Sequence, residues 1–181
     1  MIKALELNII LMEVEPYIWR KILVKDDISF ETFHAILQTT MGWEDRHLYE
    51  FETFRKGFEN ISRLYESDQN DAAKVRLSEI FNFEEVIGYI YDTGKDSWAH
   101  RIERERMVSI KEGETYPICL EGDRACPPEN VGGAERYTKL MGALEDTTHK
   151  KHQKAKKILG KAFDSAAFDL EKINKKLKNF Q

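Results

Sequence analysis

The strictest pattern in this sequence is a two-residue alternation in hydropathy that begins at Lys3 and reaches Val14. Successive side chains of a β-strand point to opposite faces of a sheet, so the alternation predicts a long strand with one well-buried face. Pro16 cannot donate a hydrogen bond to a neighbouring strand and marks the end of this one. A second strand is predicted over Ile18–Lys25, and so short a connection favours antiparallel pairing.

The remaining segments predict an α+β fold with a single antiparallel-rich sheet of about five strands. A helix is predicted from Ser29, whose hydroxyl can cap it, to about Met41, before Gly42. The other predicted strands are His47–Phe54, Val86–Asp92 and Ser97–Ile110, with a hairpin loop over Thr93–Asp96. Further helical segments are predicted over Leu77–Phe83, over 134–144, over 149–159 and after Asp164. We expect the helices to pack against the sheet, and stretches 55–76 and 116–133 to be irregular.

Length and composition point to one domain over residues 1–181, with a helical C-terminal part from about 134. No apolar run is long enough to cross a bilayer, so no membrane partner is expected. Two cysteines are too few for a disulfide framework, which favours a cytoplasmic, reducing location.

Charge is distributed unevenly along the chain. Residues 149–181 contain ten Lys against three Asp and Glu, which gives this segment a net charge of +7. Because the whole chain has a net charge of −4, the remaining residues carry −11. The C-terminal helices are therefore a candidate nucleic-acid contact. Because the segment has no Arg and few aromatic residues among its lysines, any such binding is expected to be weak and non-specific. A solvated amphipathic helix explains the same pattern.

One candidate site lies around the predicted hairpin, where Asp92 and Asp96 precede Trp98 and His100. Trp98 and His100 share a strand face. A histidine among apolar neighbours can serve as an acid, a base or a ligand, and it can equally be a buried side chain with one structural hydrogen bond.

A second candidate is the loop over 121–133, in which Pro127–Pro128 and Gly132–Gly133 enclose Glu129 and Asn130. The prolines stiffen the backbone, and the glycines permit close approach of another group and lead into a helix whose free amides can bind an anion. The alternative is a rigid loop with a helix cap.

We expect the hairpin and this loop to converge on one cleft that takes a small polar or anionic ligand, or an unknown protein partner. The candidate cleft residues are Trp43, His47, Asp92, Asp96, Trp98, His100, Glu129 and Asn130.

No cofactor is predicted and no metal site is assigned. Cys119 and Cys126 are separated by six residues, whereas zinc-binding cysteines are usually two to four apart, so a metal site that adds His47, His100 or His149 lacks support from spacing. No catalytic residue is assigned either. The enzymatic alternative is a metal-assisted or acid/base hydrolase that uses Asp92, His100 and Glu129.

Four stretches, in order along the chain, resemble the plasmid pRiA4b ORF-3-like family. They are Pro16–Arg20, Met41–Leu48, Tyr91–Asp92 with Trp98–His100, and Cys119–Gly133, of which Pro-Pro-Glu-Asn-Val-Gly-Gly is the most specific. The sequence departs from the family pattern at Thr93, where a Phe is usual, at Lys95, and at Val131, where a Cys is common. The resemblance implies an α+β fold and an association with plasmid or mobile-element genes, with no established catalytic residues. It favours a non-enzymatic binding or accessory domain.

Overall fold

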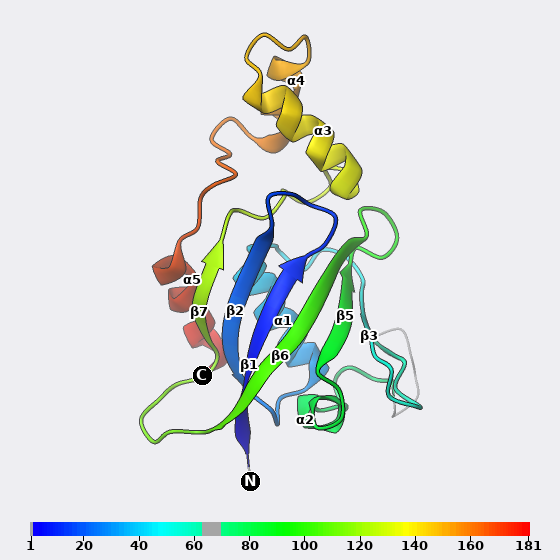
Figure 1. The fold of residues 1–181 in the computed structure, drawn as a ribbon, viewed down its shortest axis with the longest axis vertical. Coiled ribbons are helices and arrows are strands. Elements are labelled where there is room, and N and C mark those ends of the chain that lie inside the picture. The colour runs from blue at the N-terminus through cyan, green and yellow to red at the C-terminus, as the bar shows by residue number, and fades with distance from the viewer. Residues whose placement is uncertain (1, 63–69) are drawn as a thin grey trace.

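The computed structural model describes residues 2–62 and 70–181. Its centre is one sheet of seven strands in the order β4-β3-β5-β6-β1-β2-β7, in which every pair of neighbouring strands is antiparallel (Figure 1). The strands are β1 Lys3–Leu11, β2 Ile18–Lys25, β3 Tyr49–Glu52, β4 Asn60–Ser62, β5 Val86–Tyr91, β6 Trp98–Ser109 and β7 Ile118–Asp123. The antiparallel α+β fold is confirmed, with more strands than the sequence indicated.

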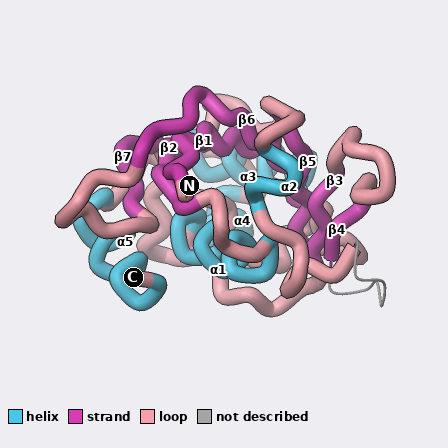
Figure 2. Tube along the Cα trace, turned by 90° about the horizontal axis from the view of Figure 1, so that it is seen from below, coloured by secondary structure: helices cyan, strands magenta, loops and turns pink. Residues whose placement is uncertain are grey.

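Five α-helices accompany the sheet within the described residues. They are α1 Phe30–Met41, α2 Leu77–Phe81, α3 Gly133–Glu145, α4 His152–Leu159 and α5 Leu170–Leu177. Helix α1 lies beneath one face of the arched sheet (Figure 2). The Ser29 hydroxyl accepts a hydrogen bond from Thr32 N, and Gly42 ends the helix with a φ of 93°. None of these helices combines the length and the apolar character needed to span a bilayer.

The core lies between α1 and the sheet face that the alternation of β1 predicts. Leu5, Leu7, Ile9 and Leu11 are all completely buried on that face. Aromatic rings from α1, β3 and β5 pack beside them, with Phe30 edge-on to Phe51 at 4.9 Å between ring centroids.

Two strands lie in stretches that were expected to be irregular. β4 is only three residues long and pairs with β3. β7 lies within 116–133 and pairs with the outer edge of β2, with an irregularity in register between Lys21 and Ile22. The prediction missed β7 because its pairing is long-range and the proline and glycine residues nearby indicate a loop.

The C-terminal helices separate into two groups (Figure 1). α5 packs against β7 and α1. The Asn174 amide accepts a hydrogen bond from Cys119 N at 2.8 Å and donates one to Cys119 O at 2.9 Å. α5 thereby supplies to the free edge of β7 the hydrogen bonds that another strand would give. Helices α3 and α4 pack on each other and extend beyond the end of the sheet.

We predict that Asn174→Ala lowers the free energy of unfolding by about 1–3 kcal/mol, because it removes both partners of the Cys119 peptide groups. Chemical denaturation measures the change. Asn179→Ala, an exposed amide in the same C-terminal segment, is the matched control and is expected to change stability by less than about 0.5 kcal/mol. Equal effects of the two variants would show that α5 does not protect the edge of β7.

Candidate binding cleft

Trp43 connects three parts of the fold immediately after α1. Its ring stacks on Tyr91 with centroids 5.0 Å apart and lies 6.2 Å from the ring of Trp98. Its indole nitrogen donates a hydrogen bond to Pro127 O at 2.9 Å. The side chain is only 7% exposed. Trp43 therefore fixes the end of α1, the ends of β5 and β6, and the proline-containing loop relative to one another.

The hairpin between β5 and β6 meets the loop that follows β7. Gly132 N donates a hydrogen bond to Asp96 Oδ2 at 3.0 Å, and Lys95 Nζ lies 3.4 Å from Asn130 Oδ1. A Cβ atom on Gly133 would lie 2.7 Å from Asp96 O, and the φ of Gly133 is 78°, so only glycine fits this approach. The two segments come together as the sequence predicted.

Glu129 joins this loop to the segment after α1. Its Oε1 accepts hydrogen bonds from the Tyr91 hydroxyl at 2.8 Å and from Glu44 N at 2.9 Å. Its Oε2 is 3.6 Å from Arg46 Nε, and Arg46 also pairs with Glu44. Burial, and then the bond to Glu129, raise the pKa of the Tyr91 hydroxyl, which stays a proton donor to the carboxylate.

His100 is a buried residue of β6. It is 3% exposed, its ring meets Trp43 edge-on at 5.3 Å, and its Nδ1 is 3.2 Å from Tyr89 O. Nε2 has no hydrogen-bond partner among the described residues. Burial lowers the pKa of His100 to about 4, against hydrogen bonds with the backbone that act in the opposite direction. The imidazole is therefore neutral at neutral pH.

Asp92 and Asp96 stabilise the hairpin itself. Asp92 Oδ2 accepts a hydrogen bond from Asp96 N at 3.2 Å, and Asp92 Oδ1 lies 3.7 Å from Nδ1 of His47. Asp92, His100 and Glu129, which the hydrolase alternative requires, bind different partners and form no common site.

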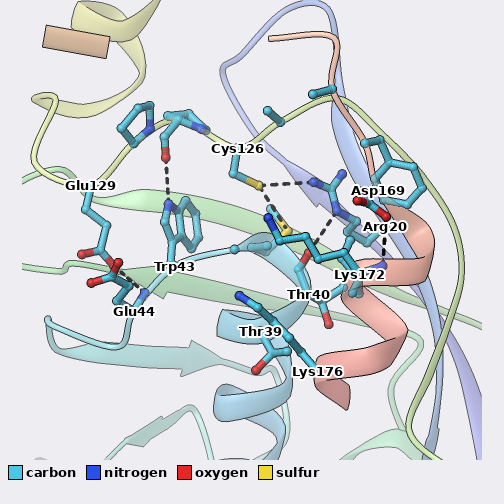
Figure 3. Close-up of a pocket in the computed structure, with 18 of the residues that line it drawn as sticks. Arg20, Thr39, Thr40, Trp43, Glu44, Cys126, Glu129, Asp169, Lys172 and Lys176 are labelled. Atoms are coloured by element: carbon cyan, nitrogen blue, oxygen red, sulfur yellow. Dashed lines mark hydrogen bonds between the residues drawn. The ribbon is translucent and has the colours of Figure 1, made fainter. Parts of the chain in front are cut away.

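A cleft of about 530 Å³ opens beside this structure, between the end of α1, the loop 125–130 and α5 (Figure 3). Of the predicted residues, Trp43, Glu129 and Asn130 line it. His47, Asp92, Asp96, Trp98 and His100 do not line it but support its wall from behind. The predicted convergence of the loops is thus present, while most of the polar hairpin residues are buried and hold the wall together.

Arg20, on β2, lies at the back of the cleft and is only 2% exposed. Nε donates to Thr40 O at 3.2 Å; Nη1 donates to Trp19 O and Asp123 O, both at 2.7 Å. Nη2 donates to Arg124 O at 2.7 Å and to Cys126 Sγ at 3.6 Å.

All five N–H groups of the Arg20 guanidinium thus have neutral acceptors. The Phe168 ring covers the group, with its centroid 4.8 Å from Cζ. No carboxylate in the described parts of the chain pairs with Arg20. Sequence reasoning missed this residue, although one signal was present: Arg20 stands between Ile18 and Ile22, at an inward position of β2.

Two further cations reach into the cleft from α5. The side chains of Lys172 and Lys176 extend from that helix toward α1 and the loop 125–130 (Figure 3). Neither pairs with a carboxylate of the described residues. With Arg20 they make three positive charges against Asp169, whose carboxylate caps α5 by accepting from Lys172 N. This half of the cleft carries a net charge of +2, while the other half holds the Arg46, Glu44 and Glu129 cluster.

The cysteines are not reactive groups in this structure. Burial raises the pKa of Cys119 and of Cys126 to about 11, although the nearby Arg20 acts to lower both. Both side chains are therefore neutral thiols at neutral pH. Within residues 2–62 and 70–181, no three His, Cys, Asp or Glu side chains are arranged to hold a metal ion.

A buried histidine that sequence reasoning did not single out anchors the segment after α1. His34 Nε2 is 2.7 Å from Asp45 Oδ1, and its Nδ1 is 2.8 Å from the Tyr89 hydroxyl. Gln38 Nε2 donates to that hydroxyl and Gln38 Oε1 accepts from Asp45 N. Tyr89 and His34 are completely buried, and the network connects β5 to α1 and to the segment that follows it.

Comparison with known proteins places the cleft in a recurrent fold. Residues 3–172 match the family described as plasmid pRiA4b ORF-3-like protein. The uncharacterized protein y4hQ of Sinorhizobium fredii (strain NBRC 101917 / NGR234) is 34% identical over 175 residues, which cover 95% of this chain and 89% of that protein. The crystal structure of MM3350, a protein of unknown function from Methanosarcina mazei Go1, gives a TM-score of 0.86 at 32% identity, over 94% of this chain and 97% of that one.

We predict a pH dependence of stability that originates at His100. Between pH 6.5 and about 4 the unfolded chain binds a proton at this residue and the folded chain does not, so stability falls as the pH falls through this window. The full effect is roughly 3 kcal/mol. His100→Phe is expected to flatten this part of the curve in urea denaturation between pH 4 and 7. His149→Asn, in the loop between α3 and α4, is the control and should leave the slope in place.

Proposed function

This chain belongs to the plasmid pRiA4b ORF-3-like family, and from that premise we propose that it is a non-enzymatic binding domain whose cleft takes a small anionic ligand. The observation that carries the proposal is the Arg20 guanidinium, which is buried at the back of the cleft and has no acidic partner within residues 2–62 and 70–181. Removal of an ion from water costs several kcal/mol unless an opposite charge compensates it. A bound anion supplies that charge.

The lysines, and not Arg20, are the direct ligands in this proposal. All five N–H groups of Arg20 already have acceptors, so its main contribution is its charge, which acts strongly in a site shielded from water. Its longest bond, at 3.6 Å to Cys126 Sγ, is the one that a ligand oxygen most easily replaces. Lys172 and Lys176 have free ammonium groups on flexible stems and can close on the anion.

The size of the cleft indicates a ligand with more than an anionic group. A volume of about 530 Å³ is that of a typical small-molecule site and exceeds what a single phosphate fills. Pro127, Pro128 and Phe163 give it apolar lining. The ligand class that fits best is therefore a small organic anion with an apolar portion.

An accessory role beside plasmid or mobile-element genes, which the family resemblance implies, stays a prediction.

The hydrolase alternative has less support. Asp92 is bound to the backbone of its own hairpin, His100 is a neutral interior group, and Glu129 accepts two hydrogen bonds and pairs with Arg46. A catalytic carboxylate and base need a shared reacting atom within hydrogen-bond reach. These three side chains do not offer one.

We predict that inorganic phosphate raises the Tm of the protein above that in sodium chloride of equal ionic strength. At ten times the dissociation constant, binding adds about 1.4 kcal/mol to stability, which corresponds to a rise of roughly 3–6 °C for a chain of this size. Lys172→Gln/Lys176→Gln is expected to abolish most of this rise without unfolding the protein, because both side chains are exposed.

The matched control is Lys156→Gln/Lys157→Gln, which removes the same charge from α4. It should retain the full phosphate effect. An equal loss of the effect in both double variants would mean that phosphate acts on overall charge, and the cleft would not be the binding site.

A further inference from the structure

A second concave surface, distinct from the cleft, lies between α3 and α4. It is a groove of about 460 Å³ in the part of the chain that extends beyond the sheet (Figure 1). Its charged and titratable lining residues are Arg136, Lys139, His149, Lys151 and Lys154. Leu140, Ala143, Ala155 and Ile158 give it an apolar floor. No Asp or Glu belongs to this lining.

The cations of this groove are largely uncompensated. Lys139 pairs with Glu135 on the same helix, whereas Arg136, Lys151 and Lys154 form no ion pair with any described residue. Residues 133–161 contain eight Lys and Arg against three Asp and Glu, a net charge of +5, so the rest of the chain carries −9. A polyanion that approaches α3 and α4 therefore meets positive charge first, away from the acidic remainder.

We propose that this groove binds single-stranded nucleic acid without sequence preference. Phosphates match cations that line both sides of the groove, and the apolar floor can accept the sugar and base faces that a single strand exposes. A duplex presents chiefly its phosphates to a surface of this kind and leaves such a floor unused. Apart from the imidazole of His149, no ring side chain lines the groove, and no Asn or Gln lines it, so amide readout of bases is absent from it.

The groove between α3 and α4 differs in charge from the surface of α5. Lys172 and Lys176 of α5 face the cleft, where Glu44, Glu129 and Asp169 also lie. A phosphate chain that follows α5 meets these carboxylates, whereas the groove between α3 and α4 offers cations alone. The basic charge of the C-terminal part thus serves two surfaces, one for a small anion and one for a polymer.

The test is fluorescence anisotropy with a labelled thymidine 20-mer titrated with the full chain at 50–200 mM sodium chloride. Contacts from three or four cations give a slope of log K against log salt of about −2 to −3. The affinity should therefore fall roughly 20- to 50-fold over this range.

Lys151→Gln/Lys154→Gln is expected to weaken binding on the order of 50-fold at 50 mM salt and to reduce the slope by about 1.4, because two phosphate contacts are lost. Lys175→Gln/Lys178→Gln, which removes the same charge from the α5 segment, is the matched control and should bind within about twofold of the unaltered chain. Thermal melts of both variants verify that they are folded.

Each of the following results would overturn the proposal: no binding at 50 mM salt, equal losses in the two double variants, or binding of a 20-base-pair duplex or an acidic peptide at least as tight as that of the single strand. The measurement is independent of the cleft, because Lys172→Gln/Lys176→Gln, which tests the proposed anion site, leaves the groove unchanged. Loss of nucleic-acid binding in that variant alone would move the site to α5 and contradict the assignment to α3 and α4.

Discussion

A buried guanidinium, which has no acidic partner in the described parts of the chain, holds together three segments of this fold. The hydrogen bonds of Arg20 join β2, the last turn of α1 and the segment after β7. Each of these hydrogen bonds gives a backbone carbonyl its donor. The Arg20 side chain thus supplies the donors that backbone N–H groups supply within helices and sheets. Gly122 permits the arrangement, since a Cβ at that position would lie 2.7 Å from the Phe168 ring that covers the guanidinium. The positive charge of Arg20 is therefore buried, yet it lies beside an open cleft.

One wall of the cleft is held by ring contacts and a hydrogen bond, whereas lysine side chains form the rim opposite it. Trp43 stacks on Tyr91 and Trp98 and is hydrogen-bonded to Pro127, so the wall is held by aromatic contact on one side and by a proline-stiffened loop on the other. Lysine side chains, with many rotamers, form the opposite rim on α5. A preformed wall with adjustable cations suits recognition of an anion whose shape varies, because the entropy of ordering is confined to a few side chains.

Local signals in the sequence were sufficient for much of this structure. The alternation of β1, the Ser29 cap and the Gly42 stop each act within a few residues, and each lies where it was predicted. The meeting of the hairpin with the Pro-Pro loop was also predictable, because Gly132 and Gly133 permit the close approach that Asp96 occupies. His100 was placed on the correct strand, but its depth in the core depends on Trp43, which comes from a distant segment.

The parts that sequence reasoning missed depend on long-range partners. β7 is defined by pairing with β2 about a hundred residues earlier in the chain and by the Asn174 amide of α5. Arg20 looks like a solvated charge on a strand until β7, α1 and the segment before α5 enclose it. Beyond the inward position of Arg20 in β2, such enclosure leaves no local pattern, since its acceptors are backbone carbonyls that every residue possesses. The pair α3 and α4 was identified as helices, yet the separation of their basic groove from the α5 cations appears only in three dimensions.

We propose that the charges of Arg20 and of the α5 lysines together create one anion site in the cleft. A titration with inorganic phosphate, followed by ¹H–¹⁵N correlation spectra of the backbone amides and of the Arg20 Nε–H, tests it most directly. The account predicts saturable shifts with a single dissociation constant for Arg20 Nε and for the amides of Cys126 and Lys172, with the amides of α4 unmoved. Shifts confined to α4, or shifts that grow linearly with phosphate everywhere, would contradict it.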